Sequence, residues 1–358
     1  MSSDSDQPGG APPDATPGEP GSSARFGRGR LNLALQGGGA HGAFTWGVLV
    51  RLLEAGIQIE GISGASAGAL NAVALASGWL RGGAAGATRA LDELWREIAR
   101  LGQMSWLRTG GLTQMAADFA AQFLSPYQLN PLGVNPLRPV LERLVEFERL
   151  RAVELPRLFI AATDVATGRA RIFRNAELSL DAVLASACLP QLHQAIEIDG
   201  AAYWDGGFSA NPPVVALVEA CAARDLVLVQ INPLHAERIP RTPREIRNRI
   251  AEIAFGRPLM EELERLRHRA GSAFAPLTWL TTRRRRLARH RMHVIDGSAE
   301  LARLDAGTKV DPTWPLLLDL RARGWQAADA WLRGHAAQRS TDPPAPVIFS
   351  PEASRGAG

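Results

Sequence analysis

The feature that most constrains the fold is an alternation near the start of the chain, in which an apolar run, a glycine-rich turn and a helical pattern follow one another twice. Leu31–Leu35 is apolar and short enough to be a buried strand, and Gly37-Gly38-Gly39 follows it. Apolar residues then recur at helical spacing over 43–54, and Gly56 is placed to end that helix.

The second round has a strand candidate at 57–62, the turn Gly64-Ala65-Ser66-Ala67-Gly68 and a helix of small residues over 67–77. Two such units in succession predict an α/β fold with a mostly parallel central sheet covered by helices. Further strands are expected at 158–162, 170–173, 195–198, 226–231 and 292–295, and helices over most of 80–150, at 180–187 and at 244–268 with a break near Gly256-Arg257-Pro258. We interpret the irregular segment 101–136 as a helical insertion packed on the core, with a lid as the alternative.

Composition sets the domain boundaries. Residues 1–30 and 338–358 are rich in Ser, Pro, Gly and Asp, so we expect disordered tails there. Between them we expect a core at 31–235 and a basic helical C-terminal part at 236–337 that packs on it, with a last strand near 291–296. The start lacks the apolar segment of a secretory signal and no apolar run approaches the ~20 residues of a spanning helix, which predicts a cytoplasmic protein that can associate peripherally with membranes.

Charge and cysteine usage restrict the class of protein further. The formal net charge of +4 is too small to predict a nucleic-acid partner, and no nucleic-acid module is recognisable. Lys309 is the only lysine, which we attribute to a compositional bias toward arginine. Cys188 and Cys221 have neither metal-ligand nor disulfide spacing, so we expect two buried thiols and no bound metal.

Gly37-Gly38-Gly39-Ala40-His41-Gly42 follows a strand and opens a helix. Glycines allow several backbone N–H groups to point at one anion beside the positive helix end, so the motif predicts a phosphate or an oxyanion site. Gly37, Gly39 and Gly42 also satisfy G-x-G-x-x-G, and Glu60 stands near the position of a ribose-binding acid. A Rossmann-type oxidoreductase is therefore an alternative at this point.

The turn from Gly64 to Gly68 matches G-x-S-x-G between a strand and a helix, the pattern of a nucleophile elbow that exposes the hydroxyl of Ser66. The alternative is an ordinary helix start with Ser66 as the N-cap. None of the downstream histidines stands in a recognisable catalytic frame. A carboxylate partner is offered by Asp205, which ends an apolar stretch before Gly206 and Gly207, although an ordinary Asp-Gly turn explains that pattern too.

Together these motifs resemble the patatin-like phospholipase family, over about Leu31–Ile231. Further similarity lies in three segments: 162–168, 185–190 and the continuation from Asp205 to Asn211 and Pro213. The resemblance implies a three-layer α/β/α fold and a Ser–Asp dyad without a catalytic histidine, metal or cofactor. By motif position it implies Ser66 as nucleophile, Asp205 as general base, and an oxyanion hole of backbone amides from Gly37, Gly38 and Gly39, with Gly42, Gly64, Gly68, Gly206 and Gly207 as supporting glycines.

Two positions depart from the family's pattern. His41 stands where the family more often has Arg or Lys, which weakens the expectation of a fixed positive charge beside the hole. His193 stands where an aromatic or aliphatic residue is more usual, which bears on the acyl pocket.

The resemblance implies a phospholipid or other acyl-ester lipid as substrate and an activity of the phospholipase A or lysophospholipase type. Basic stretches at 241–249, 265–269 and 281–286 are candidates for contact with an anionic membrane surface, and solvated helix faces explain them equally well. Besides the oxidoreductase, which leaves Ser66 and Asp205 without a role, a catalytically weak lipid-binding protein on the same fold is a third hypothesis.

Overall fold

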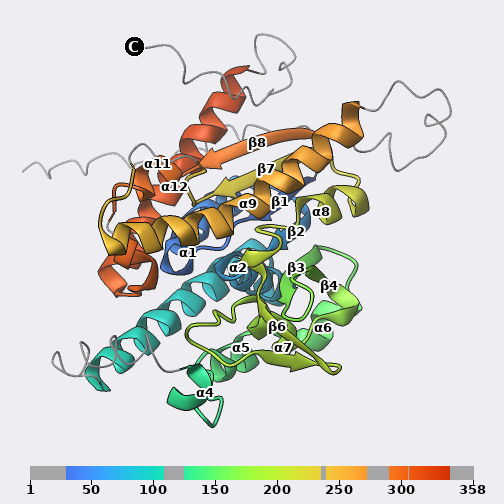
Figure 1. The fold of residues 1–358 in the computed structure, drawn as a ribbon. Helices are drawn as coiled ribbons and strands as arrows, with labels where there is room; N and C mark the ends of the chain where they lie inside the picture. The colour runs from blue at the N-terminus through green and yellow to red at the C-terminus, as the bar shows by residue number, and fades with distance from the viewer. Residues whose placement is uncertain (1–29, 109–124, 235–238, 272–289, 305, 339–358) are drawn as a thin grey trace, which may run out of the picture.

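The computed structural model describes residues 30–108, 125–234, 239–271, 290–304 and 306–338 (Figure 1). Apart from Arg30 and Gln338, the predicted tails lie outside these ranges, as does the Arg-rich run at 281–286. Residues 109–124 of the predicted insertion also lie outside them.

The centre of the molecule is an eight-stranded sheet with the order β5-β6-β3-β2-β1-β7-β8, in which β4 also pairs with β3. Strands β1, β2, β3, β7 and β8 run parallel, and the β3–β4, β3–β6 and β5–β6 pairs are antiparallel. The strands are β1 (Leu31–Leu35), β2 (Ile59–Gly64), β3 (Arg157–Asp164), β4 (Ala170–Arg174), β5 (Ile196–Ile198), β6 (Ala201–Asp205), β7 (Asp225–Gln230) and β8 (Arg291–Asp296).

Helices cover both faces of this sheet, which confirms the predicted α/β class. The α-helices are α1 (Gly42–Glu54), α2 (Ala67–Arg108), α4 (Pro126–Leu129), α5 (Arg138–Leu144), α6 (Phe147–Ala152), α7 (Leu180–Ser186), α8 (Val214–Ala220), α9 (Pro243–Gly271), α11 (Ser298–Leu301) and α12 (Trp314–Gln338). Short 3-10 helices are η1 (Gly39–His41), η2 (Asn175–Glu177), η3 (Gly206–Phe208) and η5 (Ala306–Val310).

The side chains of the central strands alternate between two hydrophobic clusters, as the period of a strand requires. Leu33, Leu35 and Val227 join the larger cluster with α1, α2, α7 and α12. Ala34 and Leu226 point to the opposite face and pack against α8 and α9, which lie together on one side of the sheet in Figure 1. The result is the three-layer α/β/α arrangement.

Three elements differ from the sequence-based expectations. Strand β6 was not predicted. Its partner β5 is only three residues long, and the Asp199-Gly200 turn that joins the two strands was not recognised as a hairpin turn. Both turn residues have a positive φ, of 52° and 79°. The helix expected over 67–77 runs on to a kink at Gly82 and Gly83, where the backbone is non-helical, and a second helix follows to Arg108 within the range labelled α2. The break expected near Pro258 does not end α9. Within the described ranges, none of the helices could cross a membrane.

The C-terminal part is joined to the rest through β8, which pairs with β7, and through α12, which lies along α1. The two helices approach most closely at glycines. A Cβ on Gly47 would overlap the carbonyl oxygen of Arg321, and a Cβ on Gly324 would overlap that of Phe44. Backbone contact of this kind leaves no room for a side chain.

Gly47→Ala is therefore expected to destabilise the protein by about 1–3 kcal/mol, because the helices must separate to admit the methyl group. The matched change Gly334→Ala is in the same helix pair but has nothing within 4 Å of its Cβ. It should be neutral or stabilising by up to ~1 kcal/mol. Urea unfolding of both variants measures the difference, and equal stabilities would contradict the close contact.

Candidate active site

The register of the sheet brings separate turns to one edge. Leu35 of β1 pairs with Gly64 of β2 and with Val229 of β7, so the three strands end at the same level. Gly64 in turn pairs with Ile160 of β3. Residues that follow these strands therefore meet at their carboxyl ends, where open α/β sheets commonly bind ligands.

Asp205 reaches the same edge from a strand of opposite direction. It ends β6, which pairs antiparallel with β3, and it lies opposite Ala162. Ala162 is two residues beyond Ile160, the partner of Gly64. Asp205 is thereby placed just past the end of β2, beside the turn that carries Ser66.

Ser66 has a left-handed backbone, with φ of 54°, between β2 and α2. This conformation is costly for a residue with a Cβ, and it differs from the extended backbone of an ordinary N-cap. The Ser66 amide donates to the carbonyl and hydroxyl oxygens of Ser186, at 3.0 and 3.2 Å. The geometry favours the nucleophile elbow over a simple helix start.

The glycine after the turn is required by a close approach. A Cβ on Gly68 would overlap the carbonyl oxygen of Leu35, at the end of β1. The start of α2 can therefore pack directly on the neighbouring strand only when residue 68 has no side chain.

The carboxyl group of Asp205 is fully buried, and its Oδ1 accepts a hydrogen bond from the Gly207 amide at 2.8 Å. Burial raises the pKa of Asp205 to about 7, and hydrogen bonding by the Ser66 hydroxyl and the Gly207 amide offsets this only in part. Oδ2 has no well-aligned hydrogen bond to another residue that the structure describes, so the Ser66 contact is loose. A carboxyl group in this state can accept a proton near neutral pH.

The glycine loop after β1 lies against the Ser66 turn, since a Cβ on Gly37 would come within 2.6 Å of the Ser66 Cβ. The Gly37 amide, however, donates to Asn211 Oδ1 at 2.7 Å. The expectation that this amide faces an oxyanion is therefore corrected: it is already used inside the protein. The amides of Gly38 and Gly39 make no hydrogen bond to another described residue.

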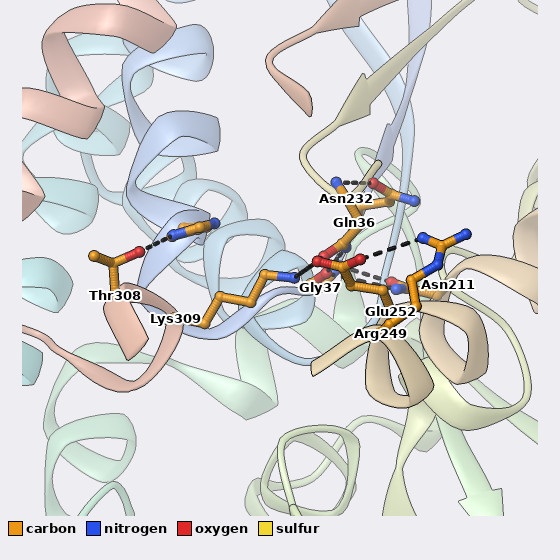
Figure 2. A network of polar contacts seen from close by, with 9 residues as sticks. Gln36, Gly37, Asn211, Asn232, Arg249, Glu252, Thr308 and Lys309 are labelled. Atoms are coloured by element: carbon orange, nitrogen blue, oxygen red, sulfur yellow. Dashed lines mark hydrogen bonds and ion pairs between the residues drawn. The ribbon is translucent and has the colours of Figure 1, made fainter. Parts of the chain in front are cut away.

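The peptide carbonyl of Gly37 is also held from β7. Asn232 Nδ2 donates to it at 2.6 Å (Figure 2). The Gln36 side chain accepts from the Ile231 and Asn232 amides at 2.8 and 3.0 Å. These contacts join the glycine loop to the segment that follows β7.

His41 and Glu60 have structural environments. His41 is buried, its Nε2 lies 2.8 Å from Thr308 Oγ1, and burial with the nearby Lys309 lowers its pKa to about 4, so the imidazole is neutral at pH 7. Both carboxylate oxygens of Glu60 accept hydrogen bonds, from the amides of Ala222 and Ala223. Glu60 is thus unavailable to a ribose, which removes the main support for the oxidoreductase alternative.

Sequence reasoning found some of these residues without their roles and missed others. Ser186 and Asn211 lie in motif segments noted for the resemblance, but their contacts with Ser66 and Gly37 were not foreseen. Asn232 and Lys309 were not proposed for the site at all. Cys188 and Cys221 are buried thiols, as expected. The described residues contain no group of three metal-ligating side chains.

The buried carboxyl group has a consequence for stability that does not involve activity. The pKa of Asp205 is higher in the folded chain than its ordinary 3.8, so the folded protein loses stability as pH rises from about 3.8 to 7. Asp205→Asn keeps the acceptor for the Gly207 amide and removes this dependence. We expect its advantage over the wild type to widen by about 2–3 kcal/mol between pH 5 and pH 8 in urea unfolding. A constant difference would contradict the raised pKa.

The family model of patatin-like phospholipases matches residues 33–218, slightly more than half of the chain. The crystal structure of VipD from Legionella pneumophila is similar with a TM-score of 0.43 and 15% identity, over 86% of this chain and 67% of that one. No curated protein matches. The chain belongs to the patatin-like phospholipase family.

Proposed function

We propose that this protein hydrolyses the carboxylic esters of lipids through Ser66 and Asp205. The observation that carries the proposal is the left-handed backbone of Ser66 beside the buried carboxyl group of Asp205, whose pKa is raised to about 7. Membership of a family of lipid acyl hydrolases supports the substrate class. A strained serine beside a buried carboxyl group that no cation among the described residues neutralises is more typical of a functional site than of a purely structural one.

In the first step, the Ser66 hydroxyl attacks the ester carbonyl while Asp205 takes its proton. The ester C–O bond then breaks, the leaving alcohol receives the proton from Asp205, and the acyl group stays on Ser66. In the second step, Asp205 takes a proton from water, whose oxygen attacks the acyl-enzyme. Collapse of that intermediate releases the carboxylic acid and returns the proton to Ser66.

The negative charge of each tetrahedral intermediate needs donors, which we assign to the amides of Gly38 and Gly39. Gly38 is half-buried and Gly39 is exposed, so an oxyanion can reach them. The helix α1 starts directly after this loop and adds the positive end of its dipole. A donor of this kind contributes about 3 kcal/mol to the transition state.

We propose phospholipids and lysophospholipids as the substrates, which gives an activity of the phospholipase A or lysophospholipase type. The basic stretch at 241–249 at the start of α9 is proposed as a contact for an anionic lipid surface.

Ser66→Ala and Asp205→Asn are each expected to lower phospholipid hydrolysis by at least ~10³-fold, because the nucleophile or its base is lost. Fatty-acid release from defined phospholipid vesicles, measured by mass spectrometry, gives the rate. A fluorophosphonate probe should label the wild type and fail to label Ser66→Ala. The control is Ser77→Ala, which removes another buried serine hydroxyl that bonds Leu144. Activity retained in Asp205→Asn would exclude the dyad.

The dyad also predicts a pH dependence. Asp205 acts as a base only when ionised, so kcat/KM should rise with pH and level off above an apparent pKa of about 7. Because the mechanism assigns no proton transfer to a histidine, the rise of kcat/KM with pH should follow a single ionisation. The profile is measured with a soluble short-chain ester, for which substrate ionisation is constant. A flat profile between pH 5 and 9 would contradict Asp205 as the base.

A further inference from the structure

The only lysine in the sequence lies beside the glycine loop. Lys309 belongs to η5, and its Nζ is 3.3 Å from Asn232 Oδ1 and 3.8 Å from Glu252 Oε1 of α9. Arg249 holds the same Glu252 carboxylate at 3.2 Å, and Figure 2 shows these side chains gathered around Gly37. Burial lowers the pKa of Lys309, and the Glu252 carboxylate opposes this effect and favours the charged ammonium.

The segment η5 contacts the same loop at two further points, once through its backbone and once through a side chain. The Lys309 carbonyl oxygen occupies the space where a Cβ on Gly39 would lie, and Gly39 has a left-handed φ of 60° that suits glycine. The neighbouring Thr308 lies 2.8 Å from the His41 ring. The segment η5 thus contacts the glycine loop, and its Lys309 side chain reaches Asn232, the residue after β7 that binds the Gly37 carbonyl.

The peptide that joins Gly37 to Gly38 connects this network to the site. Its carbonyl oxygen belongs to Gly37 and its N–H to Gly38, and the planar peptide bond points the two in opposite directions. Asn232 fixes the carbonyl at 2.6 Å and so fixes where the Gly38 N–H points. A cation on the far side of the Asn232 amide polarises this hydrogen-bond chain and makes the Gly38 N–H a stronger donor.

We propose that Lys309 is a positioning residue for ester hydrolysis, acting through Asn232 to orient and polarise the Gly37–Gly38 peptide at the oxyanion. The inference rests on the proposed function. It also assigns a source for the positive charge that His41, being neutral, does not supply. The cation comes from η5 and its anchor Glu252 from α9, both beyond the residues that match the family model.

The competing explanation is that Lys309 only ties η5 to α9 through Glu252. In that case its loss would reduce the amount of correctly folded enzyme, while each folded site would work normally. Rates must therefore be expressed per active site, counted by fluorophosphonate titration. Gly37→Ala cannot serve here, because it would disturb the Ser66 turn directly.

Lys309→Met is expected to lower kcat per titrated site by about tenfold or more with KM changed less than about threefold, since a misoriented donor weakens transition-state binding. Affinity for a trifluoromethyl ketone, which forms an oxyanion on Ser66, should fall by a similar factor. Lys309→Arg should recover most of the rate. Asn232→Ala should lose at least as much as Lys309→Met.

The control is Arg51→Met, which removes a cation of similar exposure that pairs with Asp329 near the far end of α1. It should leave kcat per site unchanged. An unchanged kcat per site in Lys309→Met, or an equal loss in Lys309→Arg and Lys309→Met, would overturn the proposal. If fluorophosphonate fails to label the wild type, the proposed function fails and this inference falls with it.

A second measurement avoids variants that fail to fold. Reductive ¹³C-methylation labels only the α-amine and Lys309, because the sequence has no other lysine. The Lys309 methyl resonance should shift when a fluorophosphonate on Ser66 places its polarised phosphonyl oxygen at the oxyanion position, and Ser66→Ala should show no change. A resonance that stays constant while Ser66 becomes fully labelled would show that Lys309 does not sense the site.

Discussion

The parallel register of β2, β1 and β7 is the constraint on which the site depends. It ends three strands at one level, so that the Gly37 loop, the Ser66 turn and Asn232 meet although they are distant in sequence. The contacts of the glycine loop with Ser66 and Asn232 cross between these strand ends. A slip of one strand would separate the hydroxyl from its donors and send apolar side chains to the wrong face.

Burial shifts the pKa values of Asp205 and His41 more than neighbouring charges do. Asp205 lies in a dry position where its ionised form is disfavoured, and His41 remains neutral for the same reason. The fold accepts a buried carboxyl group whose ionised form is disfavoured, a cost that is often found at functional sites. The ammonium group of Lys309 is linked to the Gly37 carbonyl by two successive hydrogen bonds through Asn232. A cation in this position can favour an oxyanion without neutralising Asp205 directly.

Local patterns were enough to predict β1, α1, β2 and the start of α2. The spacing of apolar residues and the position of glycine-rich turns depend only on residues that are close in sequence. These patterns also singled out Ser66 and Asp205, which the fold brings to the same edge of the sheet. They could not predict that Asn211 uses the Gly37 amide, because that contact joins residues 174 apart in sequence. Lys309 was visible as a solitary lysine and was attributed to composition, since a sequence gives no distance between residues 37 and 309.

The contact of α12 with α1 shows that the segment matched by the family model and the complete sheet with its helical cover have different boundaries. The segment that the family model matches ends at residue 218, yet β7, β8 and α12 lie beyond it and complete the sheet and its helical cover. A fragment trimmed to the matched segment would keep Ser66 and Asp205 and lose β7, the strand beside β1. The segment that the family model matches therefore leaves out part of the sheet on which the candidate site is built.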